Sequence, residues 1–128
     1  MKSSQTRSIA IAAPPEAVVE LLADGNRLPE WAPDFAPEVE AEGGHWRIGS
    51  GAGQFKIRIR SSIELGTVDF LAAADERLGA FSRVIPNGEG SEFLFTLQFP
   101  PGTEPDSIKA QMRVVEGELE AVRGLIER

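Results

Sequence analysis

The C-terminal stretch of the chain carries its most regular hydrophobic pattern. Between Thr103 and Arg128, apolar side chains recur at alternating steps of four and three residues, at Ile108, Met112, Val115, Leu119, Val122 and Ile126. This spacing predicts an α-helix with one apolar face, with Thr103 as its N-cap and Asp106 in its first turn. A helix of about 22 residues is about 33 Å long. Its apolar face must therefore cover an extended apolar surface, which we expect to be a sheet.

A period of two residues replaces the helical period in the middle of the chain. Segment 55–60 alternates between apolar and basic side chains, which predicts a strand with one buried and one solvated face. Gly43-Gly44 and Asn87-Gly88 are dipeptides typical of tight turns, and further turns are predicted at 49–53 and 75–77. The strands delimited by these signals cover residues 7–12, 38–42, 45–48, 55–60, 63–74, 79–85 and 93–99.

Two short helices are predicted after the first strand. Pro14-Pro15 favours a helix start, and Gly25 is suited to the C-terminal cap. A second helix is expected from Asn26 and carries Trp31. A run of strands with helices segregated at its two ends indicates an α+β fold. We expect residues 1–128 to form one domain, in which the long C-terminal helix lies across a curved antiparallel sheet of about seven strands.

Composition excludes several classes of function. The formal net charge is −7 and basic residues form no cluster, which argues against a nucleic-acid surface. The chain has no cysteine, so it has no disulfide, thiolate metal site or catalytic thiol. No apolar run is long enough to cross a bilayer, and the first residues lack the apolar core of a signal peptide. We therefore expect a cytoplasmic protein without membrane insertion, metal or cofactor.

The opening of the chain resembles a known superfamily. The matching residues are the strand and helix start SIAIAAPPEAV at 8–18, the segment LAD at 22–24 and the segment LPEW at 28–31. Together with the late hairpin and the C-terminal helix, they resemble the START-like or SRPBCC superfamily, also described as polyketide cyclase/dehydrase-like. The resemblance implies a helix-grip fold with a cavity between the sheet and the C-terminal helix. Its members include lipid carriers and aromatic polyketide cyclases, so the fold does not select one activity.

Large side chains on the expected inner faces are the candidates for contact with a ligand. They either fill the interior completely or line a void, and the sequence leaves both alternatives open. The candidate ligand-binding residues are Trp31, Trp46, Phe55, Ile57, Phe81, Arg83, Phe93, Phe95, Met112, Val115 and Leu119.

Arg83 is the charged member of this set. It shares its strand parity with Phe81 and Ile85. If this face looks into the cavity, the guanidinium group requires an acidic partner or an anionic ligand, which predicts an aromatic or fatty acid as the ligand. In the alternative, the same face is exposed at the edge of the sheet.

Catalytic groups are less evident than binding surfaces. The sequence shows no Ser-His-Asp set, carboxylate pair or metal cluster, and GSGAG at 49–53 precedes a strand rather than a helix, so it predicts a turn and no phosphate loop. We expect binding of a small hydrophobic molecule for transport or sensing, with a homodimer left open. The alternatives are a polyketide cyclase or aromatase that uses the same cavity, and a protein-interaction adaptor without a ligand.

Overall fold

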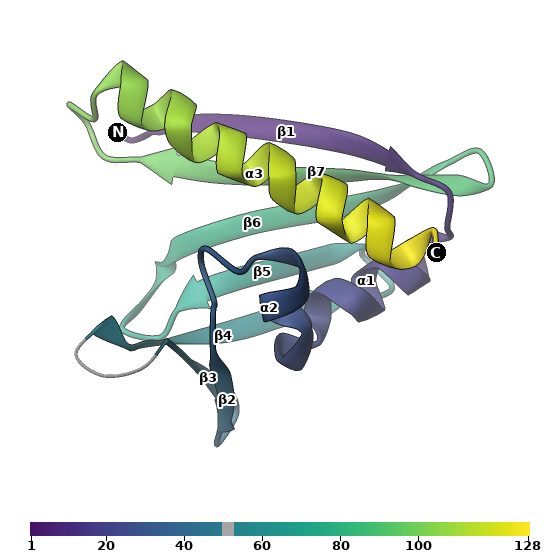
Figure 1. Cartoon of the computed structure of the whole chain (residues 1–128), viewed down its shortest axis with the longest axis horizontal. Helices are drawn as coiled ribbons and strands as arrows, with labels where there is room; N and C mark the ends of the chain where they lie inside the picture. The colour runs from purple at the N-terminus through teal and green to yellow at the C-terminus, as the bar shows by residue number, and fades with distance from the viewer. Residues whose placement is uncertain (50–52) are drawn as a thin grey trace.

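A seven-stranded antiparallel sheet forms one layer of the structure, and helices cover one of its faces (Figure 1). The structure is a computed structural model and describes residues 1–49 and 53–128. The strand order is β1-β7-β6-β5-β4-β3-β2. The elements are β1 (Ser3–Ile11), α1 (Pro15–Ala23), the 3₁₀ helix η1 (Gly25–Arg27), α2 (Leu28–Trp31), β2 (Val39–Glu42), β3 (His45–Ile48), β4 (Phe55–Ser62), β5 (Thr67–Ala72), β6 (Asp75–Asn87), β7 (Gly90–Phe99) and α3 (Pro105–Ile126). This confirms the predicted α+β helix-grip architecture.

The long helix α3 lies diagonally across the half of the sheet formed by β1 and β7 (Figure 1). Its 22 residues agree with the length expected from the apolar spacing, and Met112, Val115, Leu119 and Val122 are buried. The predicted N-cap is wrong, because Glu104 takes that position and Thr103 donates its hydroxyl to the carbonyl oxygen of Pro100. No helix in the described residues is long and apolar enough to cross a membrane.

Gly25 has a different role from the predicted one. Helix α1 ends at an extended C-cap, Asp24, whose carboxylate accepts a hydrogen bond from the Asn26 amide and so starts η1. Gly25 opens η1 where the indole ring of Trp46 packs closely, and a Cβ atom at this position would lie 2.3 Å from that ring. Glycine is therefore required here by the close approach of β3 and not as a helix cap.

Several strand boundaries also differ from the prediction, and β1 and β7 begin earlier than expected, at Ser3 and Gly90. Residues 63–66 form a turn, so β5 begins at Thr67 rather than at Ile63. The chain reverses at 73–74, and the charged residues 75–77 belong to β6 instead of forming the turn. Asp75 and Arg77 are two residues apart on one strand face, where their side chains pair at 2.9 Å. The predicted turn at 49–53 lies mostly outside the described residues, whereas the Asn87-Gly88 hairpin is confirmed.

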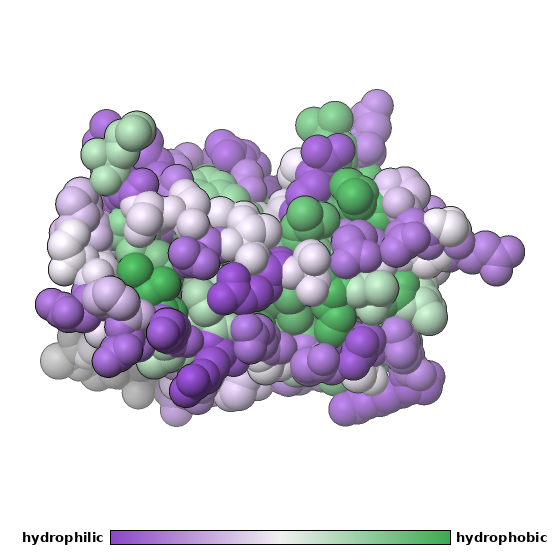
Figure 2. All heavy atoms as spheres, turned by 90° about the horizontal axis from the view of Figure 1, so that it is seen from above, coloured by the Kyte–Doolittle hydropathy of each residue, from purple (hydrophilic) through white to green (hydrophobic). Residues whose placement is uncertain are grey.

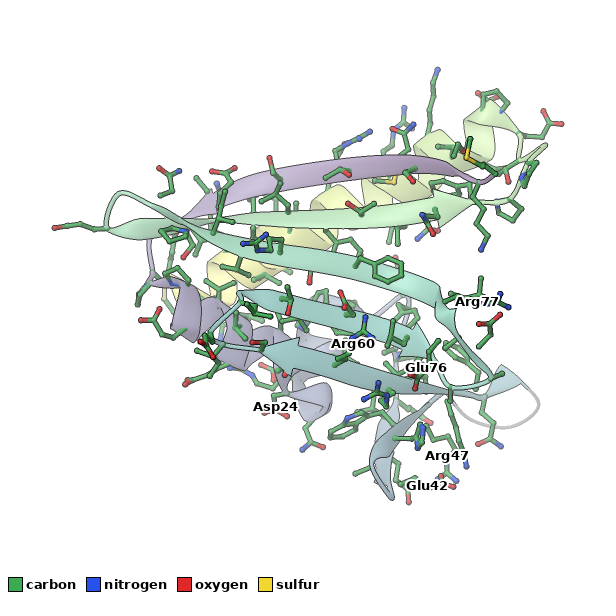
Figure 3. All side chains as sticks on the ribbon, turned by 180° about the vertical axis from the view of Figure 1, so that it is seen from behind. Asp24, Glu42, Arg47, Arg60, Glu76 and Arg77 are labelled. Atoms are coloured by element: carbon green, nitrogen blue, oxygen red, sulfur yellow. The ribbon has the colours of Figure 1, made fainter. Side chains whose placement is uncertain are left out.

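Ion pairs cover the face of the sheet that carries no helix (Figure 3). Arg58 pairs with Glu76 at 2.7 Å, and Arg60 pairs with Asp69 at 2.9 Å. Lys56 of β4 pairs with Glu42 of β2 at 2.9 Å, across the intervening strand β3. Most of these groups are well exposed, so each pair contributes little to stability. This face is solvated, and the apolar interior lies between the other face and the helices.

The buried face of α3 generates a stability prediction. Leu119 is 3% exposed within the core, so Leu119→Ala should lower the free energy of unfolding by roughly 2–5 kcal/mol through lost burial and a new void. Glu120→Ala is the control, because Glu120 lies on the exposed side of α3 and pairs there with Arg123. This substitution should cost about 0.5 kcal/mol or less. Urea denaturation checks both values, and equal losses would contradict the assigned faces.

The close packing at Gly25 generates a second prediction. Gly25→Ala should lower the free energy of unfolding by roughly 1–3 kcal/mol, because the new methyl group overlaps the Trp46 ring. Gly124→Ala is the matched control, since Gly124 lies inside α3 and a Cβ atom at this position would have no described neighbour within 4 Å; alanine should there stabilise the helix by about 0.5–1 kcal/mol. Thermal melts of both variants measure the difference, and a neutral Gly25→Ala would refute the close contact.

Candidate ligand-binding site

A cavity of about 220 Å³ lies between the helices and the inner face of the sheet. It is bounded by α2 and the segment after it, by strands β4 to β7, and by α3. Apart from two side chains on α3, its walls are apolar. The lining residues are Leu28, Trp31, Ala32, Phe35, Phe55, Ile57, Phe70, Ala72, Gly79, Ala80, Phe95, Leu97, Gln111 and Glu118.

Small residues on the sheet leave this space unfilled. Ala72, Gly79 and Ala80 occupy neighbouring positions on β5 and β6. The ladder is irregular beside Ala72, and a Cβ atom at Gly79 would lie 2.1 Å from the carbonyl oxygen of Phe70. A larger side chain at Gly79 is therefore excluded by the backbone of β5, and the void follows from this part of the sheet.

Aromatic rings form much of the surrounding wall. The ring centroid of Trp31 lies 5.7 Å from that of Phe70 and 6.4 Å from that of Phe95, both in edge-to-face arrangements. Phe35 and Phe55 pair at 5.6 Å and are 39% and 45% exposed. Because these two are the exposed rings of the lining, they mark where the cavity meets the surface.

Glu118 is the ionisable residue of the described lining. Only 8% of it is exposed, and none of the described residues donates a hydrogen bond to it or pairs with it. Burial and the nearby negative charge of Asp34 raise the pKa of Glu118 to about 7. Glu118 also belongs to the lining of a second hollow, together with Glu30, Asp34 and Arg113 among others. Glu118 therefore lines two hollows, and its carboxyl group is near its protonation midpoint at neutral pH.

A second polar group in this region lacks a partner. The indole Nε1 of Trp31 is buried and makes no hydrogen bond within the described part of the chain. An unpaired buried donor costs about 1–3 kcal/mol. The region around α2 and the middle of α3 thus contains two polar groups that have no hydrogen-bond partner among the described residues.

The predicted ligand-binding residues occupy three different environments. Four of them line the cavity, namely Trp31, Phe55, Ile57 and Phe95. Five pack in or against the core without lining it, namely Trp46, Phe93, Met112, Val115 and Leu119. Phe81 and Arg83 lie on the opposite, helix-free face of β6.

The expectation that Arg83 points into the cavity is wrong. Arg83 is exposed and its Nε donates to the carbonyl oxygen of Leu65 at 3.1 Å. The inner positions of β6 are Ala80, Ser82 and Val84. Ser82 is tolerated inside because its hydroxyl donates to the carbonyl oxygen of Val68. With Arg83 outside, the argument for an acidic ligand no longer holds.

Glu118, Phe70 and Ala80 line the cavity but were not predicted from the sequence as ligand-binding residues. Glu118 is three residues after Val115 and four before Val122, which is the spacing of the buried face and is a usable signal. Phe70 belongs to a stretch in which both parities contain apolar residues, so its buried face could not be assigned from the pattern.

The similarity of this chain to known proteins agrees with its fold. The family described as polyketide cyclase / dehydrase and lipid transport matches residues 3–127, and the chain belongs to this family. The START-like resemblance is therefore confirmed, together with a fold that binds hydrophobic ligands. No curated protein matches the sequence.

Several solved structures share this architecture. Zhui aromatase/cyclase from Streptomyces sp. R1128 is 17% identical, with 100% of this chain and 95% of that chain covered and a TM-score of 0.73. A START superfamily protein from Mycobacterium smegmatis is 14% identical, with 97% of each chain covered and a TM-score of 0.71. The Aha1 dimer from Colwellia psychrerythraea is 14% identical, with 98% and 96% covered and a TM-score of 0.73. At such identities, the likeness shows the fold alone.

The raised pKa of Glu118 predicts a pH dependence of stability. Its value of about 7 in the folded protein exceeds the unfolded value of about 4.3, so the folded state binds more protons between these pH values. The free energy of unfolding should therefore fall by roughly 1–3 kcal/mol as the pH rises from 4.5 to 7.5.

Glu118→Gln should remove this decline, because an amide does not titrate. Glu120→Gln is the control and should retain the decline of the parent protein, since Glu120 is exposed. Urea denaturation at pH 5 and pH 7.5 measures the difference for all three proteins. Identical pH profiles for the parent and Glu118→Gln would contradict the assignment.

Proposed function

We propose that this protein binds a small apolar molecule in the cavity between the sheet and α3, for transport or sensing rather than for catalysis. The observation that carries the proposal is the 220 Å³ void with walls that are apolar except at Gln111 and Glu118. An apolar cavity of about 150 Å³ holds benzene. This cavity therefore offers room for a substituted single ring or for two fused rings.

The energetic cost of such a void supports a binding role. The cavity opens to the surface beside Phe35 and Phe55, so its apolar walls face solvent instead of packing against side chains. Apolar surface that remains in contact with water costs about 25 cal/mol per Å² relative to buried surface. A ligand that covers these walls with its own apolar surface recovers part of that cost on binding.

Binding is better supported than catalysis by the groups present. The pKa of Glu118 is about 7, so its carboxyl group could act as a general acid or base near neutral pH. However, no described residue orients it, and Gln111 lies two helical turns away, about 10 Å along α3. A reaction that requires two positioned polar groups at one reacting centre has no support from this arrangement.

An adaptor role has less support than ligand binding. Ile63 and Leu65 are 53% and 64% exposed in the turn between β4 and β5, which is a small apolar surface for a partner. Polar side chains separate the apolar groups on the face shown in Figure 2. The internal void, by contrast, is a feature that an adaptor does not need.

Ethylbenzene is a suitable probe for the proposed cavity. It should bind the parent protein in calorimetry, because a monocyclic hydrocarbon fits the apolar volume. Ala80→Phe places a ring in the void and should weaken ethylbenzene binding by about tenfold or more, which is a free-energy change of about 1.4 kcal/mol. Urea denaturation of this variant verifies that it remains folded.

Arg83→Met is the matched control on the same strand. Its side chain lies on the opposite face of β6, so ethylbenzene should bind it as it binds the parent protein. Equal binding to the parent protein and to folded Ala80→Phe would place the probe elsewhere and contradict the proposed function.

A further inference from the structure

The cavity walls favour positive over negative charge in a ligand. Its described lining contains five aromatic side chains and a single ionisable group, Glu118, and it contains no lysine, arginine or histidine. Aromatic faces carry partial negative charge and attract cations. An anionic ligand would find neither a basic side chain nor a neutralising charge on these walls. The aromatic members are Trp31, Phe35, Phe55, Phe70 and Phe95.

The surroundings of Glu118 do not neutralise its carboxyl group. Asp34, in the segment after α2, opposes ionisation of Glu118. Glu30 is already engaged by Arg27 through two hydrogen bonds of 2.9 and 3.1 Å. Arg113 lines the second hollow together with Glu118, yet the two side chains form no ion pair, and Arg113 does not lower the pKa of Glu118. Of the charged groups nearby, Asp34 is therefore the one that affects ionisation of Glu118, and no described basic side chain neutralises it.

Glu118 also lacks a hydrogen-bond donor. It is more than nine-tenths buried, and no described residue donates to it. A hydrogen-bond donor that enters the cavity would stabilise a buried carboxylate in this state. The reason is that hydrogen bonds to a charged group are stronger than those between two neutral groups. A ligand that carries the missing donor would supply it from inside the cavity.

We infer that the cavity selects an apolar amine, whose ammonium group donates to Glu118 and whose hydrocarbon body packs among the aromatic rings. This inference rests on the proposed function and assigns the ligand class at the same site. Glu118 meets the ammonium group without help from Gln111, which lies about 10 Å away along α3. An alcohol satisfies the carboxyl group by a weaker neutral hydrogen bond, and a carboxylate is repelled.

Four probes of similar size test this selection at pH 8. They are ethylbenzene without a polar group, 2-phenylethanol as a neutral donor, phenethylamine as a cation and 3-phenylpropionate as an anion. At this pH a primary amine is protonated, and Glu118 is ionised above its pKa of about 7. Calorimetry or ligand-observed NMR gives each dissociation constant. Phenethylamine should bind about tenfold or more tightly than ethylbenzene, and 3-phenylpropionate should bind most weakly.

The Glu118→Gln variant tests the assigned residue. The ratio of phenethylamine affinity to ethylbenzene affinity should fall by about tenfold in this variant, because the ion pair is lost. Glu120→Gln, two residues further on the exposed side of α3, should retain the ratio of the parent protein. The same ratio in the parent protein should also fall when the pH is lowered from 8 to 5.5, because Glu118 takes up a proton.

The outcomes separate this inference from the proposed function. Failure of all four probes, ethylbenzene included, would overturn the proposed function and this inference together. Binding of ethylbenzene without a preference for phenethylamine would overturn only the amine selection. A preference for the amine that persists in Glu118→Gln, or that is unchanged at pH 5.5, would overturn the role of Glu118.

Discussion

The burial of one face of α3 against the sheet is the constraint on which the rest of the structure depends. The helix spans 22 residues and crosses the half of the sheet formed by β1 and β7. A single helix cannot cover seven strands, because its diameter is about 10–12 Å while neighbouring strands are about 4.8 Å apart. The other half of the inner face must therefore be covered by the short helices α1 and α2, and the boundary between these covers is a natural place for incomplete packing.

The cavity occupies this boundary. Its walls include residues from the helices over both halves of the sheet, namely Trp31 on α2 and Glu118 on α3. The sheet contributes Ala72, Gly79 and Ala80 at neighbouring positions, where the backbone itself excludes a side chain at residue 79. The void is thus produced by small residues beneath a gap between helices. Large side chains elsewhere on the sheet close the core, which explains why the same fold contains a packed interior and an open pocket.

Glu118 connects the packing of α3 to the chemistry of the cavity. Its position on the buried side of the helix follows from the helical period, and burial there raises the pKa of its carboxyl group. The same burial that weakens its ionisation increases the gain from a suitable ligand, since unmet hydrogen-bonding capacity is costly in a low-dielectric site. The charged groups on the outer face of the sheet are exposed to water, so their ion pairs contribute little to stability.

The sequence by itself determined the order of the elements, the strand run, the buried stripe of α3 and the family resemblance. The first three depend on local periodicity, which is written along the chain, and the resemblance depends on particular residues in segments 8–18, 22–24 and 28–31. Only the tertiary structure decided the inner face of β6 and β5, where Ser82 lies inside and Arg83 outside, because a side chain's hydrogen bonds to a neighbouring strand can reverse what its polarity indicates. The void and the partnerless state of Glu118 were also decided in three dimensions. Empty space and missing partners depend on how distant segments meet, and no local pattern records them.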